Sequence, residues 1–265
     1  MTPGDPSDLN QHLVDELLAV STMPWTDVTV VASTGSTNAD LMARVAAGEA
    51  VEGAVLAAGE QVAGRGRLDR DWASPAGSTL SFSVVLSPPV ERSGFVPALT
   101  ALAVARAIRG LSDVPVTLKW PNDVMAEHGK VAGILAEGSR GHVVVGCGIN
   151  VSVPQADLPV PTASSLSLEG ASLDRARLLV TALEQIHAAN DLWREAAYSA
   201  TGSGLLDVYR ELCGTIGVAV EVTLPDGSSV QGTAQAVDDE GRLQLTGPGG
   251  SRTLTAGDVV HLRPA

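Results

Sequence analysis

The chain has 265 residues, and 30 Asp and Glu outnumber 17 Lys and Arg to give a net charge of −13 at pH 7. This balance disfavours nucleic-acid binding over the whole surface, because phosphate contacts need a basic face. Apolar runs stay shorter than the roughly 18 residues of a membrane span, and Met1–Val20 lacks the basic start of a secretory signal. Two cysteines and five scattered histidines form no disulfide framework or zinc spacing, so we expect a reduced, cytoplasmic protein.

Strands and helices are interspersed through most of the chain. Apolar residues recur every three or four positions in some segments, and runs rich in β-branched residues occur in others. The pattern predicts an α+β domain over residues 1–214, a mixed β-sheet backed by helices. We expect helices over Asp8–Val20, from a Ser36 or Thr37 cap to Ala47, Phe95–Arg109 and Leu173–Ala197, and strands over Val28–Ala32, Gly53–Glu60, Thr79–Leu86, Val114–Trp120, Lys130–Glu137 and His142–Val151.

The composition changes after Cys213. Short β-branched runs follow one another, separated by turn sequences such as Pro225-Asp226-Gly227 and Pro248-Gly249-Gly250. Short strands at this spacing predict a small antiparallel β-barrel over residues 215–265.

An arginine cluster stands out in this acidic chain. Arg65, Arg67 and Arg70 lie within six residues, and Gly64 and Gly66 allow a ligand to approach the backbone closely. Guanidinium groups match phosphate oxygens, so the segment predicts an anion site. Its glycine spacing fits neither the P-loop nor the dinucleotide-binding fingerprint.

Lysine is almost absent from the chain. Lys119 and Lys130 are the only two, and the other 15 basic residues are arginines. Lysine is a compact point charge on a flexible stem, whereas arginine presents a wide planar fork. Two lysines kept eleven positions apart therefore indicate a site that requires a small cation.

Five motifs in order resemble those of the biotin–protein ligases. They extend from Ser36 to Val151, and the barrel-like tail is similar to the small C-terminal domain of that family. The motifs are Ser36-Thr37-Asn38, Gly64-Arg65-Gly66-Arg67 with Arg70 and Trp72, Lys119-Trp120-Pro121-Asn122-Asp123, Gly129-Lys130 with Ala132-Gly133-Ile134-Leu135, and Gly146 with Gly148-Ile149-Asn150-Val151.

The resemblance implies a fold and a reaction. The fold would be like that of class II aminoacyl-tRNA synthetases and biotin ligases, with a C-terminal SH3-like β-barrel. The biotin carboxylate would attack the α-phosphate of ATP to give biotinyl-5′-AMP and pyrophosphate. A lysine of the biotin carboxyl carrier protein domain of an acyl-CoA carboxylase would then take the biotin and release AMP. Mg²⁺ would enter with ATP rather than in a site made by the protein alone.

The resemblance also implies roles for individual residues. Lys130 would neutralise the biotin carboxylate and the α-phosphate together, assisted by Arg65 and Arg67. The biotin-binding set would be Ser36, Thr37, Asn38, Gln61, Gly64, Arg65, Arg67, Lys130 and Gly133. The ATP-binding set would be Arg67, Arg70, Trp72, Lys119, Asn122 and Asn150.

Some alternatives stay open. Ser36 or Thr37 also suits a helix cap, and Asn122 with Asp123 suits a turn. Leu68-Asp69 departs from the basic residue and glycine common in relatives, and Asp69 and Asp71 are candidates to pair with the neighbouring arginines. A lipoate–protein ligase, a non-catalytic ligand-binding regulator and a DNA-binding repressor are the rival functions. The first basic residue is Arg44, so we expect the ligase-only form.

Overall fold

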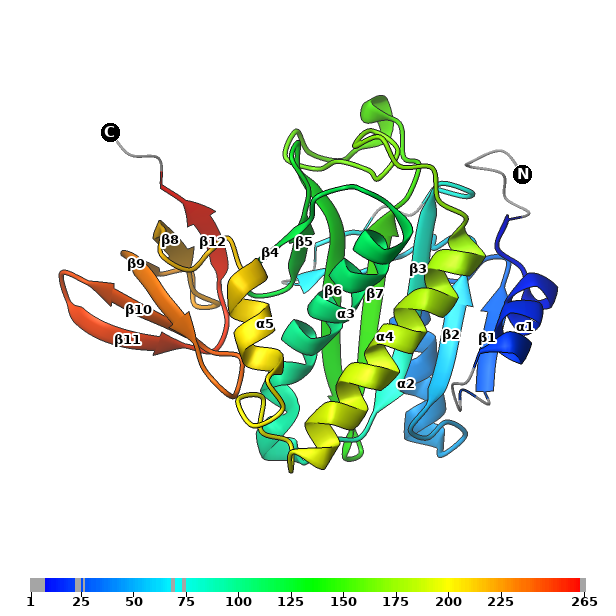
Figure 1. Cartoon of the computed structure of the whole chain (residues 1–265), viewed down its shortest axis with the longest axis horizontal. Helices are drawn as coiled ribbons and strands as arrows, with labels where there is room; N and C mark the ends of the chain where they lie inside the picture. Colours follow the sequence, from blue (N-terminus) through cyan, green and yellow to red (C-terminus); the bar gives the residue numbers. More distant parts are fainter. Residues whose placement is uncertain (1–7, 22–24, 26, 68–69, 73–74, 263–265) are drawn as a thin grey trace.

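The structure is a computed structural model, and it describes residues 8–21, 25, 27–67, 70–72 and 75–262. A large sheet with helices on both faces occupies most of the chain, and a smaller sheet extends from one side of it (Figure 1).

The large sheet is mixed. Strands β1 and β2 pair in parallel, every other pair is antiparallel, and the order is β1-β2-β3-β7-β6-β5-β4. Its strands are β1 Asp27–Val31, β2 Ala54–Ala58, β3 Thr79–Leu86, β4 Thr117–Lys119, β5 Asp123–Met125, β6 Lys130–Ser139 and β7 His142–Asn150.

Alternating side chains divide the central strands between two apolar layers. Leu56, Val85 and Val144 pack with Leu41 and Val45 of helix α2, Thr37–Ala47. The neighbouring positions on the same strands turn to the opposite face, because successive strand residues point to opposite sides. Burial on both faces extends along β2, β3 and most of β7, and β3 includes the buried polar residues Thr79, Ser81 and Ser83.

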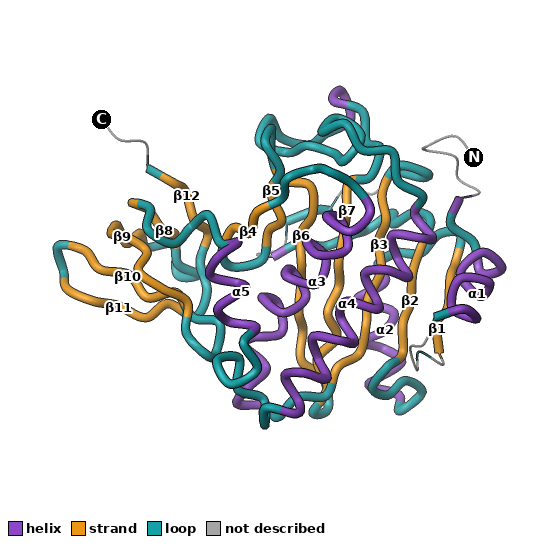
Figure 2. The backbone as a smooth tube through the Cα atoms, in the orientation of Figure 1, coloured by secondary structure: helices purple, strands orange, loops and turns teal. Residues whose placement is uncertain are grey.

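The second face is covered by two long helices. Helices α3 (Val96–Leu111) and α4 (Arg175–Glu195) lie side by side across it, as Figure 2 shows. Helix α1 (Gln11–Val20) packs against α4 and β1, and α5 (Leu205–Leu212) lies between α3 and the smaller sheet. The structure also contains the 3₁₀ helices η3 (Val90–Phe95) and η4 (Gln155–Asp157).

Among the described residues, one stretch, the 22 residues of Val90–Leu111, is long and apolar enough for a membrane span. An 18-residue window within it has a mean hydropathy of 1.3, and 67% of that window is buried inside the protein. The stretch includes α3, which supplies core side chains between the large sheet and α4. Burial by the rest of the fold accounts for its apolar composition.

The smaller sheet has five antiparallel strands in the order β11-β10-β9-β8-β12. Its inward positions are apolar, as the alternation predicts. Its strands are β8 Ala219–Thr223, β9 Ser229–Val237, β10 Leu243–Gly247, β11 Gly250–Leu254 and β12 Asp258–His261. The prediction of a mixed sheet backed by helices with a small C-terminal β-structure is confirmed.

One predicted strand boundary was wrong, and two short elements were not predicted. The strand expected over Val114–Trp120 begins only at Thr117, because Pro115 has no N–H to donate to a ladder. The expected turn after Trp120 leads into an additional short strand, β5. Helix α5 was not predicted, because an eight-residue segment gives only two turns of periodicity.

Candidate functional site

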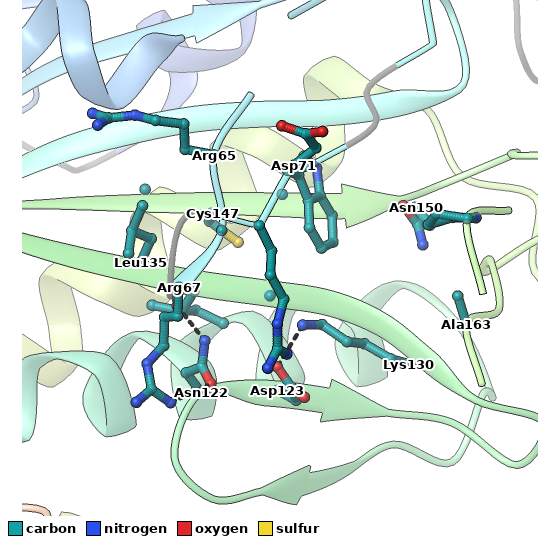
Figure 3. A pocket seen from close by; sticks show the side chains of 18 of the residues that line it. Arg65, Arg67, Asp71, Asn122, Asp123, Lys130, Leu135, Cys147, Asn150 and Ala163 are labelled. Atoms are coloured by element: carbon teal, nitrogen blue, oxygen red, sulfur yellow. Dashed lines mark hydrogen bonds and ion pairs between the residues drawn. The ribbon is translucent and has the colours of Figure 1, made fainter. Parts of the chain in front are cut away.

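A cavity of about 460 Å³ opens over the carboxyl-terminal half of β7 and the start of β6 (Figure 3). Its walls come from the N-terminus of α2, the segment after β2, strands β4 to β7, the loop before Ser164 and the first residue of β12. Every residue of the expected site lines it except Gly64, whose backbone bonds to Trp72. Those lining residues are Ser36, Thr37, Asn38, Gln61, Arg65, Arg67, Arg70, Trp72, Lys119, Asn122, Lys130, Gly133 and Asn150.

The N-terminus of α2 supplies a polar corner. Ser36 is the N-cap, and its hydroxyl accepts from the N–H of Ala39 at 3.4 Å. The N–H of Thr37 donates to Gln61 Oε1 at 2.8 Å, and its hydroxyl lies 2.9 Å from that of Ser83. The expected cap and the expected pocket position of Ser36 therefore coexist.

Asn38 carries an unpaired acceptor in this corner. Its Nδ2 donates to a Glu137 carboxylate oxygen, whereas its Oδ1 is buried and lacks a hydrogen-bond partner in the structure. Glu137 also pairs with Arg65, with 3.6 Å between Arg65 Nη2 and Glu137 Oε2. A buried acceptor without a partner costs free energy, and a ligand N–H can satisfy it.

The arginine cluster forms a short hairpin. The N–H of Trp72 donates to the carbonyl of Gly64 at 2.9 Å, and the N–H of Gly66 donates to the carbonyl of Arg70 at 2.7 Å. We call residues 64–67 and 70–72 the arginine hairpin. Leu68 and Asp69, whose effect the sequence left open, lie outside the described residues.

Trp72 occupies the floor of the cavity. A Cβ built on Gly148 would lie 2.3 Å from two indole atoms, and one on Gly133 would lie 3.0 Å from a third. The indole therefore rests on β6 and β7 in space that only glycine leaves free. Its Nε1 is buried without a hydrogen-bond partner in the structure.

Lys130 lies beside this indole at the start of β6. Its Nζ is 5.4 Å from the centroid of the Trp72 ring and 2.6 Å from Asp123 Oδ1 (Figure 3). The side chains are only partly exposed, so water screens this pair less than a surface pair. The carboxylate and the ring hold the ammonium toward the cavity.

Arg67 reaches the opposite wall. Its Nη1 donates to Asn122 Oδ1 and to the carbonyl of Gly257, each at 3.3 Å (Figure 3). Burial lowers the pKa of this guanidinium, and the nearby Asp123 carboxylate partly opposes that shift. Asn122 is fixed in turn, since its Nδ2 donates to the carbonyl of Ile134 at 2.6 Å. Asn122 therefore anchors the local backbone as well as facing the site.

Arg70 pairs with Asp258 at the start of β12. The sequence offers Asp69 and Asp71 as ion-pair partners of the neighbouring arginines. Among the described residues, the recorded ion partners of Arg65 and Arg70 are Glu137 and Asp258, so the expectation for Asp71 was wrong. Two acids far away in sequence supply these contacts, and Asp69 is outside the described residues.

The remaining pocket residues have less direct roles. Asn150 donates through Nδ2 to the carbonyl of Ser164 at 2.9 Å, which joins β7 to the loop that follows it. Lys119 lines the cavity where β4 ends. Cys147 is buried, and this burial raises the pKa of its thiol far above the ordinary value. The thiol is therefore protonated and suits packing rather than nucleophilic attack.

The sequence missed the partners of the site arginines. Glu137 lies on β6 two residues beyond the motif that ends at Leu135, Gly257 precedes β12, and Asp258 begins it. Their contacts depend on how distant segments come together, and no local signal marks them. The described residues contain no group of three or more His, Cys, Asp or Glu that could hold a metal ion.

The site combines cations, hydrogen-bonding groups and an apolar floor in one cavity. Residues 30–152 match the model of the Biotin/lipoate A/B protein ligase family, and residues 215–262 match that of the Biotin protein ligase C terminal domain. Biotin--[acetyl-CoA-carboxylase] ligase of Mycobacterium tuberculosis is 42% identical over 96% of this chain and 95% of its own. The bifunctional ligase/repressor BirA of Escherichia coli is 28% identical over 88% of this chain and 73% of its own.

A solved structure agrees with these relatives. The biotin protein ligase from Aquifex aeolicus in complex with biotin and ATP superposes with a TM-score of 0.75 at 25% identity, over 90% of this chain and 100% of that one. The fold and the cavity of the present chain therefore define it as a ligase of the biotin and lipoate class. The long match to the mycobacterial enzyme narrows this assignment: the chain belongs to the biotin protein ligase family.

Proposed function

We propose that this chain is an ATP-dependent biotin–protein ligase that makes biotinyl-5′-AMP and transfers biotin to a lysine of a carrier domain. The single observation that carries the proposal is the Lys130 ammonium, held by Asp123 and Trp72 in a cavity that also contains the arginine hairpin. A net charge of −13 repels anions in general. A pocket lined by five cations offsets this repulsion locally.

In the first step, a biotin carboxylate oxygen bonds to the α-phosphorus of ATP and the bond to the β-phosphate oxygen breaks. Pyrophosphate leaves with the bonding electron pair. Two anions must approach each other, and unit charges about 4 Å apart repel by ~4 kcal/mol at an effective dielectric of 20. We assign Lys130 to neutralise both of them, with Arg65 and Arg67 at the rim.

The biotin end is assigned to the corner at α2. The unpaired Asn38 Oδ1 supports an N–H donor of the ureido ring as its partner, since biotin carries two such groups. Ser36, Thr37 and Gln61 offer hydroxyl and amide groups beside it. Gly64 lets the hairpin approach, and Gly133 leaves room for the Trp72 indole next to the acyl chain.

The nucleotide end is assigned to the wall near the C-terminal sheet. Arg67, Arg70 and Lys119 offer cations to the phosphates, while Trp72, Asn122 and Asn150 lie along the same cavity. Asn122 is already bonded to Arg67 and Ile134, so its proposed role is to orient Arg67.

Mg²⁺ is proposed to arrive with ATP. Magnesium is usually held by one or two carboxylates together with substrate phosphates and water. Asp71 and Asp123 line the cavity and fit that requirement, although Asp123 already pairs with Lys130. The metal would supply charge neutralisation for the departing pyrophosphate.

In the second step, a lysine amine attacks the acyl carbon of biotinyl-AMP, AMP leaves, and the nitrogen loses a proton. The proposed acceptor is the biotin carboxyl carrier domain of an acyl-CoA carboxylase. The name of the mycobacterial relative supports a carboxylase as acceptor. The free, buried thiols of Cys147 and Cys213 support a reducing compartment, the cytoplasm, as the place of action.

We further propose that the chain divides into a catalytic domain at residues 1–214 and a C-terminal domain at 215–265. The two separate sheets support this division. The two contacts from the turn before β12 to the arginine hairpin support a direct part for the C-terminal domain in the site.

Incubation with biotin, MgATP and a carrier domain tests the function. We expect the carrier mass to rise by one biotin, with no change when ATP is omitted. Replacing biotin by lipoate separates the two acids of the family. A carrier that gains lipoate but not biotin contradicts the proposal.

A further inference from the structure

The turn before β12 is the part of the C-terminal sheet that reaches the cavity. Arg67 Nη1 donates to the carbonyl of Gly257 at 3.3 Å, and Arg70 forms an ion pair with Asp258. Asp258 also lines the cavity. Two arginines of one hairpin thus meet two consecutive residues about 190 positions later in the chain.

The C-terminal sheet and the segment that leads into it are attached to the catalytic part of the chain through Trp120 and Arg92. Trp120 is 1% exposed, and its Nε1 donates to the carbonyl of Gly241 at 2.9 Å. The N–H of Trp120 donates to Thr215 Oγ1 at 3.1 Å, and Arg92 pairs with Asp239 at 3.0 Å. The C-terminal sheet therefore offers the hairpin a fixed point of attachment.

The arginine side chains of the hairpin have little buried support, in contrast to the Trp72 indole, which packs on β6 and β7. The side chains of Arg65 and Arg70 are 46% and 63% exposed, and the described backbone bonds of the hairpin run between its own two strands. Beyond the Trp72 packing, the arginines attach the hairpin to the rest of the fold. Arg65 pairs with Glu137, Arg67 donates to Asn122 and to the carbonyl of Gly257, and Arg70 pairs with Asp258. Segments with few buried contacts open most readily.

We propose that Asp258 is a positioning residue for ATP. Its carboxylate holds the Arg70 guanidinium at the edge of the cavity, and the arginine hairpin with it, before the nucleotide arrives. A cation ordered in advance loses less conformational freedom on binding phosphate, so affinity improves. This inference rests on the proposed function for its nucleotide, whereas the contact between Asp258 and the hairpin does not.

Repulsion between the Asp258 carboxylate and the ATP phosphates would have the opposite effect on ATP binding. A carboxylate at the cavity also repels phosphate. If repulsion outweighed positioning, removal of the charge would tighten ATP binding. The sign of the change in the KM for ATP therefore decides between the two.

The first experiment needs no ligand. In Asp258→Asn the side chain keeps its size and loses its charge, and we expect hydrogen exchange at the Gly66 and Trp72 amides to accelerate several-fold. Asp207→Asn is the matched control, because it removes the same charge from an exposed pair with Arg210 on α5. Unchanged exchange in Asp258→Asn, with thermal unfolding also unchanged, overturns the proposal.

The second experiment measures ATP kinetics with biotin and the carrier domain. We expect Asp258→Asn to raise the KM for ATP about two- to five-fold with kcat unchanged, which is the scale of an exposed ion pair. Asp258→Glu should restore most of the loss, and Asp258→Asn should add nothing in an Arg70→Gln background. The proposal is overturned if Asp258→Asn lowers the KM for ATP or leaves it unchanged. It is also overturned if Asp258→Asn raises this KM by the same factor with Arg70 present and with Arg70→Gln. If the unsubstituted chain does not biotinylate the carrier domain, the proposed function is wrong. The hydrogen-exchange experiment still tests the contact between Asp258 and the hairpin in that case.

Discussion

Arg175 and Arg70 each form an ion pair with an aspartate far away in sequence, and the two pairs differ in burial. The side chains of Arg175 and Asp8 are 0% and 3% exposed, whereas those of Arg70 and Asp258 are 63% and 28% exposed. Arg175 also donates to the carbonyls of Gly59 and Thr79, at 3.3 and 3.2 Å. The same chemistry therefore stabilises the fold in one region and remains available to a ligand in the other.

The largest effect we expect concerns the buried pair. Arg175→Met should lower the free energy of unfolding by about 3–5 kcal/mol, because Asp8 would remain buried without its partner. The measurement is denaturant unfolding monitored by circular dichroism. Activity per folded molecule should be unchanged, since Arg175 does not line the cavity.

Acid should reduce this loss. Burial raises the pKa of Asp8, and Arg175 opposes that shift. Without Arg175 the folded state would favour the protonated carboxyl more strongly, so the cost is small below the ordinary pKa of 3.8 and grows as pH rises through the folded pKa. A double variant with Asp8→Asn should recover part of the stability. A loss independent of both pH and Asp8 would sink this explanation.

The second largest effect we expect concerns Lys130 in the cavity, where activity rather than stability should fall. Lys130→Ala should lower the rate of biotinyl-AMP formation about 10²–10³-fold, the usual scale for removing one preorganised charge from a reaction site. Its unfolding free energy should change far less than that of Arg175→Met. Biotin-dependent pyrophosphate exchange measures the rate. Arg252→Ala, at an exposed cation of β11, is the control and should leave the rate unaltered.

A smaller effect tests the apolar floor. Gly148→Ala puts a Cβ 2.3 Å from the Trp72 indole, so the ring must shift. We expect biotin affinity to fall about 10-fold, because one overpacking methyl costs ~1–3 kcal/mol. Titration calorimetry with biotin measures it. Gly138→Ala is the matched control on β6, where a Cβ meets nothing within 4 Å. Equal affinities for the two variants would refute the proposed place of the ring.

The smallest effect we expect is a pH-dependent change in stability from the contact between His128 and Glu169. The hydrogen bond to Glu169, 3.0 Å from His128 Nδ1, raises the pKa of the imidazole. The folded state therefore binds the proton more tightly, and this contribution is complete below pH 6.5 and disappears as pH rises through the folded pKa. His128→Gln should be less stable than the unsubstituted chain near pH ~5.5 and nearly equal near pH ~9 by denaturant titration. An equal difference at both pH values contradicts this.

The sequence predicted the parts of the site that are coded locally. Ser36 caps α2 because its hydroxyl and the helix N–H groups are three residues apart, and the glycines at 64 and 66 mark a tight hairpin. The order of short motifs was sufficient to predict the family and the fold, both of which are confirmed.

The rest of the site depends on tertiary packing. Glu137 and Asp258 reach the arginines only because β6 and β12 converge on the cavity, and neither carboxylate belongs to one of the motifs. The sequence did not predict that the Trp72 ring packs on Gly133 and Gly148, because this contact joins segments far apart in the chain. Helix α5 is too short for its periodicity to be distinguished from chance.

The central claim is that one ammonium and the arginine hairpin hold two anions together in this cavity. A crystal structure with a non-hydrolysable analogue of biotinyl-AMP tests it most directly. The account predicts the acyl-phosphate linkage within hydrogen-bond distance of Lys130 Nζ, the ureido ring at Asn38, and the nucleotide beside Arg67. An analogue bound with its linkage away from Lys130 would contradict it.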